Sequence, residues 1–336
     1  MHMVPYIVRR IFLSMFTILA ISVLAFVIIE LPPGDQVDRF KEITESRREV
    51  PDPEKIEALR SYLGLDQPQY IRYLKWMVNL AQGDLGLSFQ YRREVDMPVK
   101  QLLENRLWLT VALTGFTILV TWTFAIPVGI YSAVRQHSVG DYVFTFLGFT
   151  GLAVPDFLLG LVLMYVAFAY FDMSVGGLNS ANYINSPWDL ARFRDLLNHL
   201  WIPAIVLGTS GTAGLIRVMR NNLLDELGKP YVATARAKGL PSVKAILKYP
   251  VRVAINPLIS TVGYLLPSLV SGSIIVSVVL SLPTLGPLLL EGILAEDVYL
   301  SGFIILMAGV LTVVGTLISD ILLAVVDPRI KYATSH

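Results

Sequence analysis

The sequence contains no cysteine, which excludes a disulfide framework, a thiolate metal site and a cysteine nucleophile. Charge is scarce as well: Asp, Glu, Lys and Arg make up 16% of the 336 residues, against roughly 25% in an ordinary soluble domain. The 27 basic and 26 acidic residues leave a net charge of +1, so nothing indicates a surface for nucleic acid. Hydrophobic residues make up 54% of the chain and gather in long blocks, which indicates a lipid environment.

Short catalytic motifs are also absent. The chain has no G-x-x-x-x-G-K-[ST] loop to hold a nucleotide, no H-E-x-x-H and no G-x-S-x-G. Its four histidines are scattered along the sequence, at His2, His137, His199 and His336. We therefore expect no catalytic residue and no metal ligand in this chain, and any energy from ATP must be supplied by another protein.

Six apolar stretches are candidates for membrane-spanning helices. The first runs without a charge from Ile11 to Ile29, close to the ~20 residues that cross a hydrocarbon core of ~30 Å. A cleaved signal peptide is the weaker interpretation, because its apolar region is usually ~7–15 residues long and ends in an A-x-A-like site that is missing here. The other stretches lie near residues 107–134, 141–171, 201–216, 256–281 and 302–326.

Helix-disturbing residues occur in four of these stretches: Pro127, Pro155, Pro203, Pro257 and Pro267, with Gly208, Gly211 and Gly214 at three-residue spacing. In lipid, a broken helix must have its backbone groups met by neighbouring helices or by a water-lined cavity, so such spans suit a bundle that moves. Glycine and proline are also generally more frequent in membrane helices, and the pattern alone does not decide between the two explanations.

The distribution of Lys and Arg predicts the orientation of the spans, because short cytoplasmic loops are enriched in basic residues. With a cytoplasmic N-terminus, the short outer loops hold only Arg192 and Arg194, and the inner segments hold the other basic residues of the short connections. The segment 32–106 is long enough to cross the membrane largely regardless of its charge. We therefore place both termini in the cytoplasm.

Two acids, Asp156 and Asp320, lie deepest inside the predicted spans. An Asp at the centre of a span costs roughly 2.5–3.5 kcal/mol, so each carboxyl is expected to face the interior of the bundle or an aqueous path. Both are candidates for polar residues of a translocation path. A structural hydrogen bond is the alternative, and it is the stronger one for Asp320, which lies close to the cytoplasmic end of its span.

The polar segment 32–106 carries helix signals and is expected to fold as a small extracytoplasmic cap. Asp52 can cap a helix that has Pro53 in its first turn and Gly64 as its stop, and a second helix is predicted from Gln69 to Gln82. The aromatic residues of the second helix have an alternative place in the lipid headgroup region, where such rings are common: Tyr70, Tyr73 and Trp76.

The predicted cytoplasmic loop 217–255 is rich in basic residues and contains two short helices. The first runs from Tyr231 to Lys238 and ends at Gly239. Ser242 is expected to cap the second, Val243–Tyr249, whose apolar side chains share one face and whose lysines share the other. Two helices joined at a glycine predict a projecting knob. The alternative is a basic loop that lies on anionic lipid.

One stretch of this loop resembles the ATPase-coupling loop of ABC importer permeases, in the form used by the dipeptide, oligopeptide and nickel branch: Thr234-Ala235-Arg236-Ala237-Lys238-Gly239-Leu240. Other short motifs of that branch follow in order along nearly the whole chain: Pro33-Gly34-Asp35, Leu63-Gly64-Leu65-Asp66, Gly83-Asp84-Leu85-Gly86 and Asp327-Pro328-Arg329. Two positions depart from the general pattern. Ala233 replaces a Glu, as is typical of this branch, and Gln36 replaces a common second proline, which leaves the substrate class open.

The resemblance implies an all-α integral membrane protein, with six transmembrane helices in a type I ABC importer permease bundle. Residues 1–31 would form the cytoplasmic N-terminus and the first span, and residues 32–106 a helical extracytoplasmic insertion. Residues 107–326 would form a five-helix core that contains the coupling loop 217–255, and residues 327–336 a cytoplasmic tail.

The resemblance also implies partners in a bacterial or archaeal cytoplasmic membrane. These are a second homologous permease subunit, two cytoplasmic ABC ATPases that bind ATP and Mg, and an extracytoplasmic solute-binding protein. Oligopeptides are the first substrate candidates, and aromatic residues of the outer loops, Tyr183 and Trp188, keep oligosaccharides open. The alternative function is a secondary transporter or channel that needs no ATPase. It has little support, because only two acids and no basic residue lie deep in the predicted spans.

Overall fold

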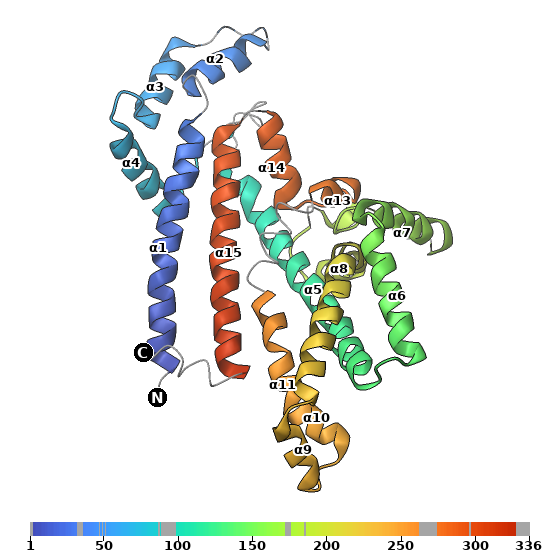
Figure 1. Cartoon of the computed structure of the whole chain (residues 1–336). Helices are drawn as coiled ribbons and strands as arrows, with labels where there is room; N and C mark the ends of the chain where they lie inside the picture. Colours follow the sequence, from blue (N-terminus) through green and yellow to red (C-terminus); the bar gives the residue numbers. More distant parts are fainter. Residues whose placement is uncertain are drawn as a thin grey trace. The chain divides into compact units, whose positions relative to one another are not determined.

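The structure is a computed structural model, and every regular element among its described residues is a helix (Figure 1). It describes residues 3–31, 36–46, 48, 50, 52–86, 88, 99–171, 176–184, 186–261, 274–295 and 297–326. The motifs predicted at residues 33–35 and 327–329 and the tail 327–336 lie outside the described residues. The helical, apolar character of the chain confirms the predicted all-α membrane class.

Within the described part of the chain, three helices are long and apolar enough to cross a membrane: Ile7–Glu30 in α1 (Met3–Glu30), α5 (Val99–Val134) and Tyr299–Val326 in α15 (Val298–Val326). Two bent helix pairs satisfy the same test when each pair is taken together, which makes up to five spans among the described residues. The stretch predicted near 256–281 falls partly on residues 262–273, which lie outside them.

The first bent pair covers the stretch predicted near 141–171, which is not one straight helix. It consists of α6 (Val139–Ala153) and α7 (Asp156–Phe171), which meet at 102°. Val154 between them is extended, with ψ of 126°, as a residue that precedes a proline prefers to be. Pro155 therefore marks a sharp turn of the chain inside an apolar stretch.

The second bent pair lies in α8 (Leu190–Leu227), which extends well beyond the stretch predicted at 201–216. Its halves, Leu190–Thr209 and Gly211–Leu227, meet at 56°, within the glycine-rich part of the sequence. After Arg217 the chain continues with helix-forming residues, Met, Leu, Glu and Arg among them, so the helix continues although the apolar stretch has ended.

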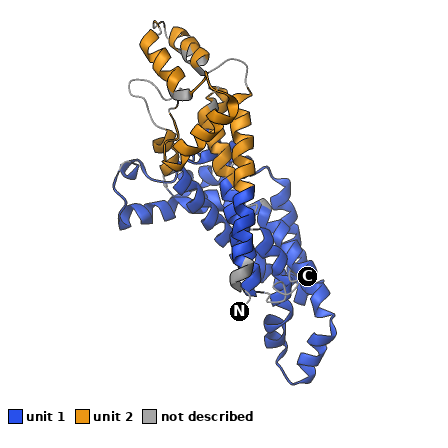
Figure 2. Cartoon of the chain, turned by 90° about the vertical axis from the view of Figure 1, so that its left-hand side faces the viewer, with its two compact units in different colours: residues 1–16, 106–288, 310–336 blue, residues 17–105, 289–309 orange. Residues whose placement is uncertain are grey.

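The chain divides into two compact units, drawn in different colours in Figure 2. One consists of residues 1–16, 106–288 and 310–336, and the other of residues 17–105 and 289–309. Besides parts of the long helices, the first unit holds α6, α7 and α8. It also holds the short helices η1 (Ala181–Tyr183), α9 (Pro230–Ala237), α10 (Ser242–Lys248), α11 (Pro250–Ala254) and α13 (Ile274–Val279). The second unit holds α2 (Gln36–Ser46), α3 (Pro53–Leu63), α4 (Gln69–Ala81) and most of α14 (Leu285–Leu294).

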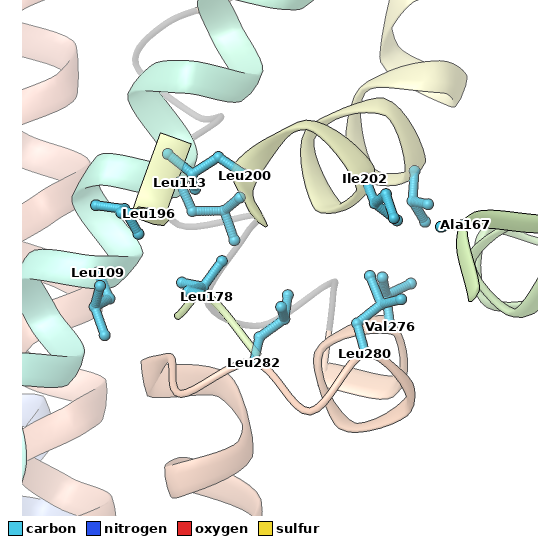
Figure 3. Close-up of a cluster of buried hydrophobic side chains, with 11 residues drawn as sticks. Leu109, Leu113, Ala167, Leu178, Leu196, Leu200, Ile202, Val276, Leu280 and Leu282 are labelled. Atoms are coloured by element: carbon cyan, nitrogen blue, oxygen red, sulfur yellow. The ribbon is translucent and has the colours of Figure 1, made fainter. Parts of the chain in front are cut away.

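The first unit is held by two clusters of buried apolar side chains. Figure 3 shows the first cluster, which joins α5, α7 and α8 to α13 and to the residues that follow α13; its members include Leu109, Leu113, Ala167, Leu196, Leu200, Val276 and Leu280. The second cluster joins α5, α8 and the region of α11; its members include Ala125, Met219, Leu223, Ala254 and Leu258. Because α8 contributes to both clusters, it is the central packing element of this unit.

The second unit confirms the predicted helix ends. The Asp52 side chain caps α3 by accepting a hydrogen bond of 3.0 Å from the backbone N–H of Glu54. Gly64 ends α3 in a left-handed conformation, with φ of 63°, and Gly83 adopts φ of 80° just after α4. Both glycines therefore stand where a side chain would strain the backbone.

The aromatic residues of α4 have two different environments. Trp76 is 8% exposed and packs against Phe26 and Phe303, with ring centroids 5.8 Å and 5.5 Å away, and Tyr73 lies 5.5 Å from Phe26. Tyr70 is 68% exposed. Of the three aromatic residues, only Tyr70 is therefore still a candidate for the lipid headgroup region. Tyr73 and Trp76 belong to an aromatic cluster within the protein.

Candidate functional site

The predicted coupling loop folds as a compact helical knob between α8 and α11, and Figure 1 shows α9 and α10 lying beyond the ends of those two helices. Pro230 opens α9 and Pro250 opens α11, at positions where the missing proline N–H leaves no bond unmade. The inner face of the knob is apolar and buried, and it is formed by Val232, Ala235, Ala245 and Ile246.

All seven residues of the sequence-predicted site lie together at the end of α9. The backbone N–H of Gly239 donates to the carbonyl of Arg236, and that of Leu240 donates to the carbonyl of Ala235, at 2.9 Å and 3.3 Å. These two bonds form a Schellman motif, which satisfies carbonyls that the helix end would leave unpaired. Ala235 is buried and Leu240 half-buried, while the other five residues are exposed: Thr234, Arg236, Ala237, Lys238 and Gly239.

Position 239 requires a glycine because of its backbone conformation, and not because neighbouring atoms leave no room for a side chain. Its φ is 81°, a left-handed value that costs an ordinary L-residue about 1–2 kcal/mol. A Cβ atom built on Gly239 meets no other atom within 4 Å. The space around this turn is therefore free for contact with another protein.

Two predictions about α10 are wrong. Ser242 does not cap the helix, because Pro241 occupies the cap position with φ of −52° and ψ of 138°, and Ser242 is the first helical residue. The predicted apolar face is also divided: Ile246 is buried, but Val243 and Leu247 are 70% and 53% exposed. These two side chains, one helical turn apart, form an exposed apolar pair on the outer face of the knob.

A buried glutamate, which the sequence reasoning missed, ties the knob to α8. Glu226 is 8% exposed, and its Oε1 lies 2.5 Å from the Nζ of Lys229. Its Oε2 accepts a hydrogen bond of 2.5 Å from the hydroxyl of Tyr231. Charge-assisted bonds of this kind are about twice as strong as neutral ones, so α9 is fixed at the root of the loop. The only sequence signal was a pair of adjacent acids, Asp225 and Glu226, in a loop that is otherwise basic.

The two acids predicted for a translocation path lie on different helices and in different settings. Asp156 is half-buried and opens α7 at the turn after Pro155, where the partial positive charge of a helix N-terminus stabilises a carboxylate. Asp320 lies in α15, and its Oδ2 is 3.1 Å from a guanidinium nitrogen of Arg10 in α1. The structure thus gives Asp320 an ion pair with a residue far away in the sequence, a partner that neither interpretation of the sequence had named.

A second ion pair, also missed from the sequence, joins α6 to α8. Both carboxylate oxygens of Asp141 accept hydrogen bonds from the guanidinium group of Arg220, each at 3.1 Å. The backbone N–H of His137 donates a third bond, at 3.0 Å, to the same carboxylate, which is 3% exposed. The bidentate geometry fixes the register between the start of α6 and the distal half of α8.

The sequence matches two family models along most of its length. The model described as "Binding-protein-dependent transport system inner membrane component" covers residues 125–332, and the model for the N-terminal part of such membrane components covers residues 3–114. The chain is 37% identical over 333 residues to the oligopeptide transport system permease protein AppB of Bacillus subtilis, which covers 98% of this chain and 100% of that protein. It is 30% identical over 347 residues to the dipeptide transport system permease protein DppB of Escherichia coli K12, covering 98% of this chain and 99% of that protein.

Proposed function

The chain belongs to the family of binding-protein-dependent transport system inner membrane components, and from that premise we propose that it is the permease subunit of an ATP-driven importer of peptides. The likeness to two permeases named for oligopeptides and dipeptides extends over nearly the whole length of all three chains. That end-to-end likeness is the observation that carries the proposal, because it includes the cap, the spans and the knob together.

The partners in this proposal are a second permease subunit, two cytoplasmic ABC ATPases and an extracytoplasmic solute-binding protein. The ATPases bind ATP and Mg, since the chain itself has no phosphate-binding loop. Both termini and the knob face the cytoplasm, as the distribution of basic residues predicts. The exposed residues of the segment from Thr234 to Leu240, together with the exposed apolar pair Val243 and Leu247, form the surface that an ATPase contacts.

In the proposed mechanism, the ATPases close on ATP and displace the knob, which moves the bundle from an inward-open to an outward-open state. Converting a two-state bundle from 1:99 to 99:1 requires about 5.5 kcal/mol of differential stabilisation. A loosely attached loop would dissipate that energy. Here the bonds of Glu226 to Lys229 and Tyr231 and the Schellman end of α9 make the knob a firm extension of α8.

The substrate and the energy source are tested by reconstituting the full-length chain with its partner subunits in vesicles. Uptake of a labelled oligopeptide that requires ATP and survives a protonophore supports the proposal. Uptake of an oligosaccharide in place of peptide would reassign the substrate. Solute movement by the chain without an ATPase would establish the secondary-transporter alternative and remove the proposal.

The coupling role is tested by Gly239→Asp. We expect this variant to insert normally and its assembly to hydrolyse ATP, but with uptake uncoupled from hydrolysis, because the left-handed turn is strained and its open surface is blocked. Gly228→Asp is the matched control, since Gly228 is equally exposed in the same loop but has an ordinary φ of −78°. Unchanged transport by Gly239→Asp would reject the assignment of the knob.

A further inference from the structure

A cavity of about 490 Å³ lies between α6 and α8, outside the knob. Polar residues line the part near the turn before α6, where Asp141 and Arg220 form their ion pair. Toward the middle of α6 the lining becomes apolar, with Gly148 and Phe149 from α6 and Ala213 from α8. The cavity is therefore amphiphilic along its length.

Of the two arginines that line this cavity, only Arg220 forms an ion pair within the described part of the chain. Arg220 is neutralised by Asp141, whereas among the residues that the structure describes no carboxylate forms an ion pair with Arg217. Arg217 lies three residues, about one helical turn, closer to the middle of α8 than Arg220 does. Its guanidinium group lies 4.9 Å from the centroid of the Phe149 ring, which holds the cation against the apolar part of the cavity.

The position of Arg217 in a helix that is a candidate membrane span indicates what kind of ligand the cavity would bind. Arg217 belongs to the Gly211–Leu227 half of a membrane-span candidate, and an uncompensated cation there is costly unless an anion or water meets it. The surface of α6 beside the cavity is apolar and open, since Tyr142 and Phe146 are 62% and 70% exposed. Phosphates of lipid headgroups are the anions that accompany such a surface, and basic pockets between spans on the cytoplasmic side bind them.

We propose that this cavity is a binding site for one anionic phospholipid of the cytoplasmic leaflet, a location that rests on the orientation given in the proposed function. The guanidinium of Arg217 donates hydrogen bonds to the headgroup phosphate. An acyl chain lies along the apolar part of the cavity, beside Phe149 and Gly148. The ion pair between Asp141 and Arg220 keeps the Asp141 carboxylate from competing for Arg217.

Native mass spectrometry tests this site on the assembled transporter, released from nanodiscs that contain equal amounts of phosphatidylglycerol and phosphatidylcholine. We expect wild type to retain phosphatidylglycerol preferentially. Arg217→Gln should weaken that retention about tenfold, as the loss of one charge-assisted contact implies. Arg252→Gln is the control, because Arg252 is exposed on α11 and does not line the cavity. Thr145→Trp, which fills the cavity from its wall and leaves Arg217 in place, should abolish retention.

Four results would overturn the site. Equal retention of the two lipids would remove the requirement for an anion. Equal behaviour of Arg217→Gln and Arg252→Gln would remove Arg217. Displacement of phosphatidylglycerol by millimolar inorganic phosphate would make the cavity a site for a free anion. A crosslink from a cysteine at position 145 to the second permease, with no lipid retained, would assign the surface to a subunit contact. ATP-driven uptake measured on the same preparation shows separately whether the proposed function holds.

Discussion

The ion pair between Asp141 and Arg220 yields an asymmetric prediction. Arg220→Met leaves the Asp141 carboxylate 3% exposed without its guanidinium partner, and removal of one member of a buried pair typically costs about 3–5 kcal/mol. Asp141→Asn leaves the Arg220 side chain, which is 23% exposed and able to reach water, so we expect a smaller cost of about 1–3 kcal/mol. The variant that removes the more exposed residue should thus be the more damaging.

The assay is unfolding of the purified chain in a fixed lipid–detergent mixture, with the two single variants and the double variant completing a cycle. We expect the double variant to be more stable than Arg220→Met alone, because it no longer contains a buried unpaired charge. Lys100→Met is the control: its pair with Glu104 is 3.8 Å long and exposed, and should contribute less than about 1 kcal/mol. Equal costs for the two single variants, or additive costs in the double variant, would refute the reasoning.

Two further variants test close packing and a buried bond in the other unit. Gly302→Ala should lower the free energy of unfolding by about 1–3 kcal/mol, because its added Cβ would overlap the side chain of Ile29. Gly115→Ala is the control: nothing lies within 4 Å of the added Cβ, so the variant should be neutral or stabilising by up to about 1 kcal/mol. Thermal unfolding distinguishes the two variants, and equal shifts of the midpoint would contradict the packing at Gly302. Ser88→Ala should cost about 1–3 kcal/mol, because the Ser88 hydroxyl donates a bond of 2.6 Å to Asp297, which is 1% exposed; an unchanged midpoint would show that this bond contributes nothing.

Local signals predicted local structure well. The cap at Asp52, the stop at Gly64 and the break at Gly239 follow from side-chain and backbone preferences that act within a few residues. The expectation for Ser242 failed for an equally local reason, since Pro241 already supplied the extended conformation of the cap position. The resemblance carried by the seven residues from Thr234 to Leu240 led to the correct family.

Contacts between distant segments were not predictable from one sequence. The partners Asp141 and Arg220 are 79 positions apart, and Ser88 and Asp297 are 209 apart. The spacing of apolar residues predicts that a helix has a buried face, but it does not predict which other helix packs against that face. The predicted span also ended at residue 216, because it was drawn from hydropathy, whereas α8 continues to Leu227 through backbone propensity and packing. For that reason the sequence did not indicate that Arg217 lies on the same helix as other residues that line the cavity.

The bend in α8 makes the knob the end of a lever arm. Residues 211–227 extend about 25 Å at about 1.5 Å per residue, so a swing of about 10° about the bend carries the root of the knob by about 4 Å. The same swing moves Gly211 itself hardly at all. A rotation at the glycine-rich bend therefore produces its largest displacement at the knob, and the size of that displacement is set by how many residues separate the bend from Glu226.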